Sequence, residues 1–246
     1  DTPLAICIMA SVMMKDGIPM RVTPKAVRQP KAKALSSGST PAIAPGNGML
    51  ATFTQSGGAI VAAGTTVTSS GAQSLQGGSI AGNLDGAGAI TAASGTTNIT
   101  GTVTNAASLS VTGGTVNVTG AGTVDTAGNA ISVSAGTLST DANAIADNET
   151  VSVSATGTFT TAGADSFAAL NQSGGTVNGS GVLTLAGAFT QSGGTTGGTV
   201  DINAATFTQS GGATIGAGTT VTSAGAQLLQ GGTIAGALDG AGAVTV

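Results

Sequence analysis

A long internal repeat constrains this sequence more than any other feature. Residues 51–92 and 205–246 are identical at 33 of 42 positions, at a constant offset of 154 residues. Both copies begin with Ala-Thr-Phe-Thr-Gln-Ser-Gly-Gly and run on to an Asp-Gly-Ala-Gly-Ala segment. A repeat of this length indicates a stacked or arrayed architecture. The second copy ends at Val246, in the middle of the repeat, so we expect the chain to be a piece of a longer repetitive protein.

Composition divides the chain near residue 50. Residues 1–50 contain all six prolines and all six basic residues, whereas residues 51–246 contain no Lys, Arg, His, Pro, Cys, Met, Trp or Tyr. We therefore expect a basic, Pro-rich lead segment over 1–50 and a repeat domain over 51–246. The repeat domain has eight acids and no cation, which argues against nucleic-acid binding because phosphate backbones need Lys and Arg. The basic stretch 15–33 is either a solvated linker or a contact for an anionic partner.

The lead segment does not read as a membrane span. No run in the chain reaches the ~18 apolar residues that a membrane helix needs. Leu4–Met14 is apolar throughout, but its flanks are not those of a signal peptide. A hairpin fits better, with a turn at 15–17 and a second strand over Ile18–Val22, and it could cap the first coil of the repeat domain. The single Cys7 argues against a disulfide framework.

A shorter repeat, which we call the beat, lies inside the 154-residue unit. An apolar residue followed by x-Gln-Ser-Gly-Gly occurs at Phe53, Leu170, Phe189 and Phe207, and the last three recur at nearly equal intervals. A related Leu-Gln-Gly-Gly motif occurs at Leu75 and Leu229, at the same distance after Phe53 and Phe207 respectively. Apolar anchors at Leu109, Ile131 and Val151 continue the rhythm, and only the stretch between Leu75 and Leu109 shows no clear beat.

Within each beat the pattern is that of a strand. Polar and apolar residues alternate over 108–112, 115–119 and 182–185, and paired turn residues such as Gly-Gly follow every 6–9 residues. Short strands with a beat of 18–22 residues predict an all-β fold, a right-handed parallel β-helix (β-solenoid) of about ten coils. A β-sandwich array is the alternative, but it predicts repeats near ~100 residues and more aromatic residues.

The β-helix explains the unusual composition. Equivalent positions stack along the axis, so we expect Leu170, Phe189 and Phe207 to form an internal stack. Gln172, Gln191 and Gln209 should then form a hydrogen-bonded ladder of side chains. Stacked Lys or Arg in every coil would repel each other, which gives a physical reason for their absence from the repeat domain.

Residue types that carry catalysis are scarce. Without His there is no Ser-His-Asp or Cys-His arrangement and no imidazole metal site. Asp141, Asp147 and Glu149 form the most polar stretch, and two of these carboxylates could hydrolyse a glycoside or hold a cation. A solvated loop between coils explains them better. We therefore expect no enzyme, and we assign no catalytic, cofactor-binding or metal-binding residue.

Two further motifs have ordinary explanations. Asp85 and its copy Asp239 lie in Gly-rich segments similar to calcium-binding nonapeptide repeats, but they recur only once per long repeat and fit turn-capping residues better. Thr-x-Thr occurs at 66–68, 102–104 and 220–222. Flat threonine ladders on a β-helix can bind ice, a use that requires the motif on nearly every coil. The β-propensity of Thr accounts for these three pairs.

The run LNQSGGTVNGSGVLTLAGAFTQSGGTTGG (170–198) resembles the repeats of filamentous-haemagglutinin-like exoproteins and of autotransporter adhesin passengers, which are bacterial surface proteins. The resemblance covers roughly 51–246 and implies secretion across the outer membrane and a stalk or adhesive role. No Arg-Gly-Asp tripeptide occurs in the chain.

We therefore expect a non-enzymatic structural or adhesive rod of a secreted or surface-anchored bacterial protein, located outside the cell. Its partners would be a host-cell, matrix or glycan surface, with end-to-end or lateral self-association and no membrane insertion by this segment. The alternatives are an ice-binding or polysaccharide-binding β-solenoid and, less favoured, a β-helix glycoside hydrolase.

Overall fold

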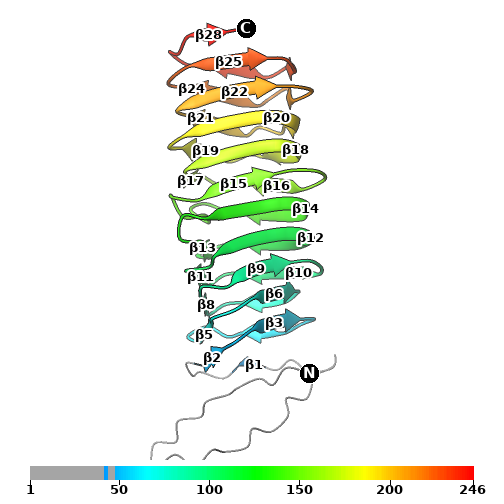
Figure 1. Ribbon diagram of the computed structural model, residues 1–246, viewed down its shortest axis with the longest axis vertical. Coiled ribbons are helices and arrows are strands. Elements are labelled where there is room, and N and C mark those ends of the chain that lie inside the picture. The colour runs from blue at the N-terminus through cyan, green and yellow to red at the C-terminus, as the bar shows by residue number, and fades with distance from the viewer. Residues whose placement is uncertain (1–41, 44–47) are drawn as a thin grey trace, which may run out of the picture.

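The chain folds into a rod of parallel strands, which the computed structural model describes for residues 42–43 and 48–246. The described part contains strands and no helix, and the strands stack into a β-solenoid of about ten turns. No helix in these residues could therefore cross a membrane. In Figure 1 the near strands run rightwards while the chain rises, as in a right-handed coil. The fold class is confirmed, and the hairpin predicted within 4–22 lies outside the described residues.

Most of the strands belong to one sheet, sheet A, of 18 strands. Each coil contributes two segments to it, on faces that we call the first and second face. The first face contains β3 (Phe53–Ser56), β6 (Gln73–Gln76), β9 (Ala89–Ala92), β15 (Thr150–Val153), β22 (Thr206–Ser210), β25 (Gln227–Gln230) and β28 (Val244–Thr245). The second face contains β1 (Ala42–Ile43), β4 (Ile60–Val61), β7 (Gly78–Ile80), β10 (Thr96–Ile99), β16 (Thr158–Thr161), β23 (Thr214–Ile215) and β26 (Thr233–Ile234). Four long strands run across both faces: β12 (Ser108–Val118), β14 (Ala130–Thr140), β18 (Ala169–Gly179) and β20 (Ala188–Thr196).

The third face consists of two shorter sheets, each of five strands. Sheet B contains β2 (Gly48–Leu50), β5 (Thr66–Ser69), β8 (Asn83–Asp85), β11 (Thr102–Thr104) and β13 (Thr123–Val124). Sheet C contains β17 (Asp165–Phe167), β19 (Val182–Leu185), β21 (Asp201–Ala204), β24 (Thr220–Ser223) and β27 (Ala237–Asp239). Between β13 and β17 the described chain has a single isolated bridge, Val124 to Ile145, in place of a strand.

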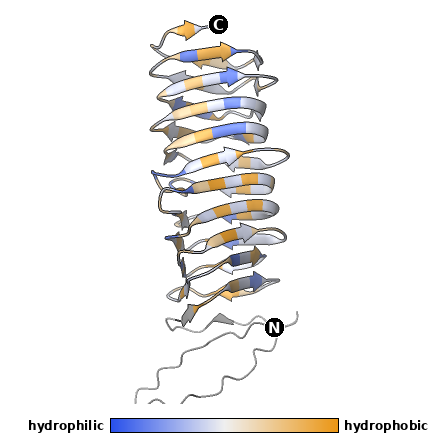
Figure 2. Ribbon diagram, in the orientation of Figure 1, coloured by the Kyte–Doolittle hydropathy of each residue, from blue (hydrophilic) through white to orange (hydrophobic). Residues whose placement is uncertain are grey.

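The alternation of polar and apolar residues in the sequence corresponds to side chains that point alternately out of and into the solenoid. In β10, β15 and β24 every second side chain is buried, and Figure 2 shows the same alternation of hydropathy in successive coils. The interior holds small aliphatic residues and a few aromatic rings, because facing strands leave little width between them. Phe189 stacks on Phe207 with ring centroids 5.2 Å apart, and Phe159 meets Phe167 edge-on at 6.2 Å.

The stacks predicted from the Gln-Ser-Gly-Gly motif are confirmed. Leu170 pairs with Phe189, and Phe189 pairs with Phe207, all three buried. Two residues further along the strands, Gln191 donates to Gln172 (3.1 Å) and Gln209 donates to Gln191 (3.2 Å). The ladder is internal, with each Gln side chain at most 1% exposed. Anchors Leu109, Ile131 and Val151 also pair in the predicted order.

The register of the Leu-Gln-Gly-Gly motif was predicted wrongly. Gln73, and not Leu75, pairs with Phe53, and Leu75 pairs with Gln55. The second copy does the same, with Gln227 opposite Phe207. In these coils the buried apolar and buried amide positions have exchanged places, which keeps the inward pattern but moves the apolar anchor by two residues. Ile90 pairs with Gln73 one short coil later. It is the inward apolar anchor of the stretch between Leu75 and Leu109, where the sequence showed no clear beat.

Glycines at the bend between the first and second faces allow close stacking of the coils. Gly136 has φ +78, and a Cβ there would lie 2.1 Å from the Gly114 carbonyl oxygen of the preceding coil. An L-residue would therefore be strained by its backbone and would also collide. The Gly-Gly of the beat lies at this same bend and closely follows the inward Gln.

Candidate functional site

The acidic stretch runs from the end of the second face, past the single bridge of the third face, to the start of the first face. Glu149 is fully buried, and its carboxylate accepts hydrogen bonds from the Thr126 amide (2.8 Å), the Gly128 amide (3.1 Å) and the Thr126 hydroxyl. Asp141 accepts from the Gly120 amide (3.0 Å), and Asp147 is exposed. The carboxylates of Asp141 and Glu149 are thus bound to backbone groups of the preceding coil.

Asp165 is a buried acid that sequence reasoning missed. It is 2% exposed at the start of β17 and pairs with Leu183, so it occupies an inward position that is apolar in the next coil. Its Oδ1 accepts from the amides of Ile145 (3.2 Å) and Ser166 (3.1 Å). Its Oδ2 is buried and has no hydrogen-bond partner in the described part of the chain.

Burial raises the pKa of Asp165 from 3.8 to about 6. Backbone hydrogen bonds from Ile145, Ser166 and Ala144 oppose the rise, and the charge of Asp147 adds to it. A single Asp carries no sequence signal of burial. Its inward position becomes evident only from the strand register, which places Asp165 opposite the buried Leu183. A buried carboxyl with a raised pKa is a feature of catalytic acids, but also of structural groups that interrupt a sheet.

The Thr-x-Thr pairs lie on the third face and point outward. Asn83 and Asp85 separate the first two pairs, so these threonines do not form a continuous ladder. Thr102 donates to Asn83 (2.7 Å), and Asp85 accepts from Thr104 (3.3 Å) and Asn105 (2.8 Å) of the next coil. Asp85 therefore joins two coils, whereas its copy Asp239 accepts from the Gly240 amide (2.7 Å) of its own turn.

A different threonine ladder runs along the second face. Eight threonines pair with one another in successive coils, and all of them point outward. We call this set the threonine column: Thr96, Thr115, Thr137, Thr158, Thr176, Thr195, Thr214 and Thr233. Sequence reasoning missed it, although a Gly-Thr pair marks seven of its eight members. Gly-Thr also precedes third-face strands, as at Gly101-Thr102, so the pair alone did not identify one face.

Charged side chains of residues 51–246 lie away from the first and second faces. None of the strands of sheet A contains an acid or a base in the residues whose side chains are described. The eight acids of 51–246 lie on the third face or in the connections that lead into and out of it. The first and second faces are therefore neutral surfaces of hydroxyl and amide groups.

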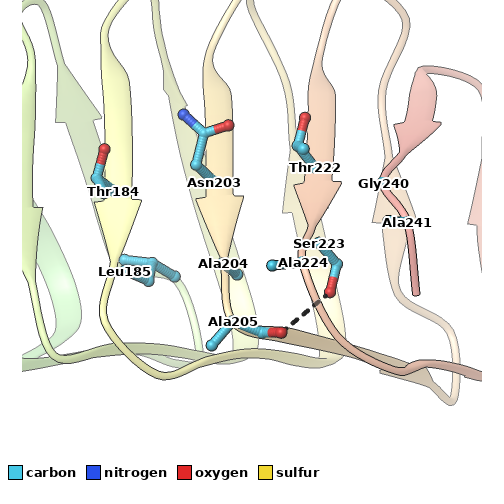
Figure 3. A pocket seen from close by; sticks show the side chains of 10 residues that line it. All are labelled: Thr184, Leu185, Asn203, Ala204, Ala205, Thr222, Ser223, Ala224, Gly240 and Ala241. Atoms are coloured by element: carbon cyan, nitrogen blue, oxygen red, sulfur yellow. Dashed lines mark hydrogen bonds between the residues drawn. The ribbon is translucent and has the colours of Figure 1, made fainter.

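A shallow depression of about 320 Å³ lies where sheet C meets the corner before the first face (Figure 3). Thr184, Asn203 and Thr222 line one part, and small residues such as Ala204 and Ala224 leave the space. Ser223 donates to the Ala205 carbonyl oxygen (3.4 Å) across it. Its lining contains no titratable side chain, so it offers neither a general acid nor a general base.

In the described part of the chain, no three His, Cys, Asp or Glu side chains lie together as a metal site would require. A scan against protein-family models finds no match, and searches of curated proteins and of solved structures find none either. The resemblance to bacterial surface adhesins therefore depends on the repeat residues themselves.

Proposed function

We propose that this chain is a non-enzymatic rod of a bacterial protein displayed outside the cell, where it serves as a stalk or adhesive segment. The observation that carries the proposal is the unbroken sheet A, in which parallel pairing continues through every coil from β3 to β28. About ten coils at ~4.8 Å each give a rod of roughly 50 Å. A stack of this kind extends in proportion to its sequence, as a spacer must.

The surface chemistry supports an extracellular role. Residues 51–246 contain no Lys or Arg, so trypsin-like proteases find no cleavage site in the rod. Its neutral hydroxyl and amide faces suit many weak contacts along a partner better than one deep pocket. The buried bonds of Glu149 and the bond of Asp141 to backbone groups also favour a structural role for the acidic stretch.

Surface shaving tests the location. Intact source cells are treated with proteinase K, and the rod is detected by immunoblot with an antibody raised against residues 51–246. We expect the signal to disappear while a cytoplasmic control protein persists. Trypsin serves as a matched control, because it cannot cut after Lys33. Survival of the rod in intact cells, with loss only after lysis, would contradict the proposal.

A further inference from the structure

We propose that the second face is an ice-binding surface, with the threonine column as its contact row. This inference goes beyond the proposed rod function, because a stalk needs no particular outward column. The three Thr-x-Thr pairs of the third face do not meet the requirement of a motif on nearly every coil. The threonine column does, since it continues through eight successive coils without a gap.

The hydroxyls of the column are available to water. In the described part of the chain none of them donates to or accepts from another protein group, whereas outward residues of other columns are bonded to each other. Each threonine also presents a methyl group beside its hydroxyl. The row thus combines apolar groups, which order neighbouring water, with hydroxyls that can take places in a water lattice.

A second row of outward side chains runs beside the threonine column on the second face. In five of the eight coils a further outward side chain lies two residues beyond the threonine, in the row Asn98, Asn117, Ser139, Thr160 and Asn178. Asn117 donates to Asn98 (2.9 Å) and Thr160 to Asn178 (2.7 Å), so this row is held in place. Strand geometry sets the two repeats at ~4.8 Å along the axis and ~6.7 Å across it. Oxygen atoms on the surface of hexagonal ice recur at spacings close to these.

The charge distribution favours an uncharged ligand. The rod is acidic, yet both rows lie on strands without acids, and the nearest carboxylate in sequence follows β14 at the corner, in Asp141. A neutral lattice can approach such a face without removing water from a charge. An anionic or cationic partner would find no charge complement here.

Area argues against a second copy as the occupant. The column is about 34 Å long and the second row is shorter, so a face about 12 Å wide gives at most ~400 Å² per copy. A stable protein interface buries ~800 Å² per partner, with an apolar core that these two rows lack. An ice surface needs no such core, because adsorption sums many equal weak contacts on a lattice that is already ordered.

The test measures thermal hysteresis and inhibition of ice recrystallisation with the full 246-residue chain. Thr158→Lys places a charged, bulky side chain in the middle of the column. Thr184→Lys is the matched control, because Thr184 is an exposed strand residue on the third face. Thr158→Val removes only the hydroxyl and keeps the branched shape. Far-UV circular dichroism and melting temperature establish that each variant is folded.

We expect the wild-type chain and Thr184→Lys to show thermal hysteresis, and Thr158→Lys to lose it. Should Thr158→Lys unfold, loss of hysteresis in a folded Thr158→Val variant decides the same point. A folded wild-type chain without hysteresis or recrystallisation inhibition overturns the proposal. Equal loss in both Lys variants overturns the assignment to this face. So does a sedimenting dimer that Thr158→Lys dissociates, because the face would then bind a second copy.

Discussion

At the scale of single residues, two buried acids of neighbouring coils differ in how completely their carboxylates are hydrogen-bonded. Glu149 has a donor for each carboxylate oxygen, whereas Asp165 has one oxygen bonded and one buried without a partner among the described residues. An incompletely bonded buried carboxyl is better accommodated as the neutral acid, in line with the raised pKa of Asp165. We therefore expect substitution to destabilise the rod at Glu149 and to stabilise it at Asp165.

Asp165→Asn should stabilise the rod at neutral pH. Because the pKa is about 6 in the folded chain and 3.8 in the unfolded chain, the folded state binds more protons between these values. Stability from this group is present in full below pH 3.8 and is lost as the pH rises to about 6. Urea unfolding at pH 4.5 and 7.5 measures the effect. We expect a gain on the order of 1–2 kcal/mol for Asp165→Asn at pH 7.5 and a smaller one at pH 4.5. An equal effect at both values would contradict the raised pKa.

Glu149→Ala should destabilise the rod by about 3 kcal/mol, because it leaves the buried amide and hydroxyl of Thr126 without their acceptor. The exposed neighbour provides the control, and Asp147→Asn should change the free energy of unfolding by less than about 0.5 kcal/mol. Equilibrium unfolding in urea compares the two variants. Similar values for both would mean that the Thr126 loop is not held by Glu149.

At the scale of the element, the bend between the first and second faces depends on glycine. Gly136→Ala combines a positive φ with a contact of 2.1 Å to the Gly114 carbonyl oxygen. We expect a loss of about 3 kcal/mol, measured by thermal unfolding. Gly212 lies in the matching turn of a later coil, has ordinary φ and has no atom within 4 Å of an added Cβ. Gly212→Ala should be neutral or slightly stabilising, and a comparable loss there would show that the close contact is not the cause.

The sequence predicts the stacking of those elements in which each motif residue occupies the same position in successive coils. Phe189 and Phe207 occupy the same place in consecutive motifs, so their stacking and that of Gln191 on Gln209 follow directly. Leu75 was misplaced because Gln and Leu exchange inward positions in β6, which no alternation pattern distinguishes. The coils also differ in length, and a fixed period loses register after a few of them, which hides the threonine column. The burial of Asp165 could not be predicted for the same reason, because it depends on the strand register.

At the scale of the whole molecule, the 154-residue repeat corresponds to eight coils, from Phe53 to Phe207 in one inward column. The inward Gln makes equivalent bonds to backbone carbonyls in the two copies. Gln55 donates to the carbonyl oxygens of Ala59 and Ser79, both at 2.9 Å, and Gln209 donates to Ala213 (3.3 Å) and Thr233 (3.2 Å). Duplication of such a unit lengthens the rod and keeps each face on the same side.

The axial direction of the pairing determines how the rod bears a load. Hydrogen bonds between coils lie along the axis, so tension between the ends acts on one coil boundary at a time. Each coil that peels away, such as the one from Leu170 to Phe189, removes ~5 Å of rod and releases about 65 Å of extended chain. Under flow or pulling, the segment becomes an extensible tether that lengthens in steps, while the remaining coils keep their faces intact.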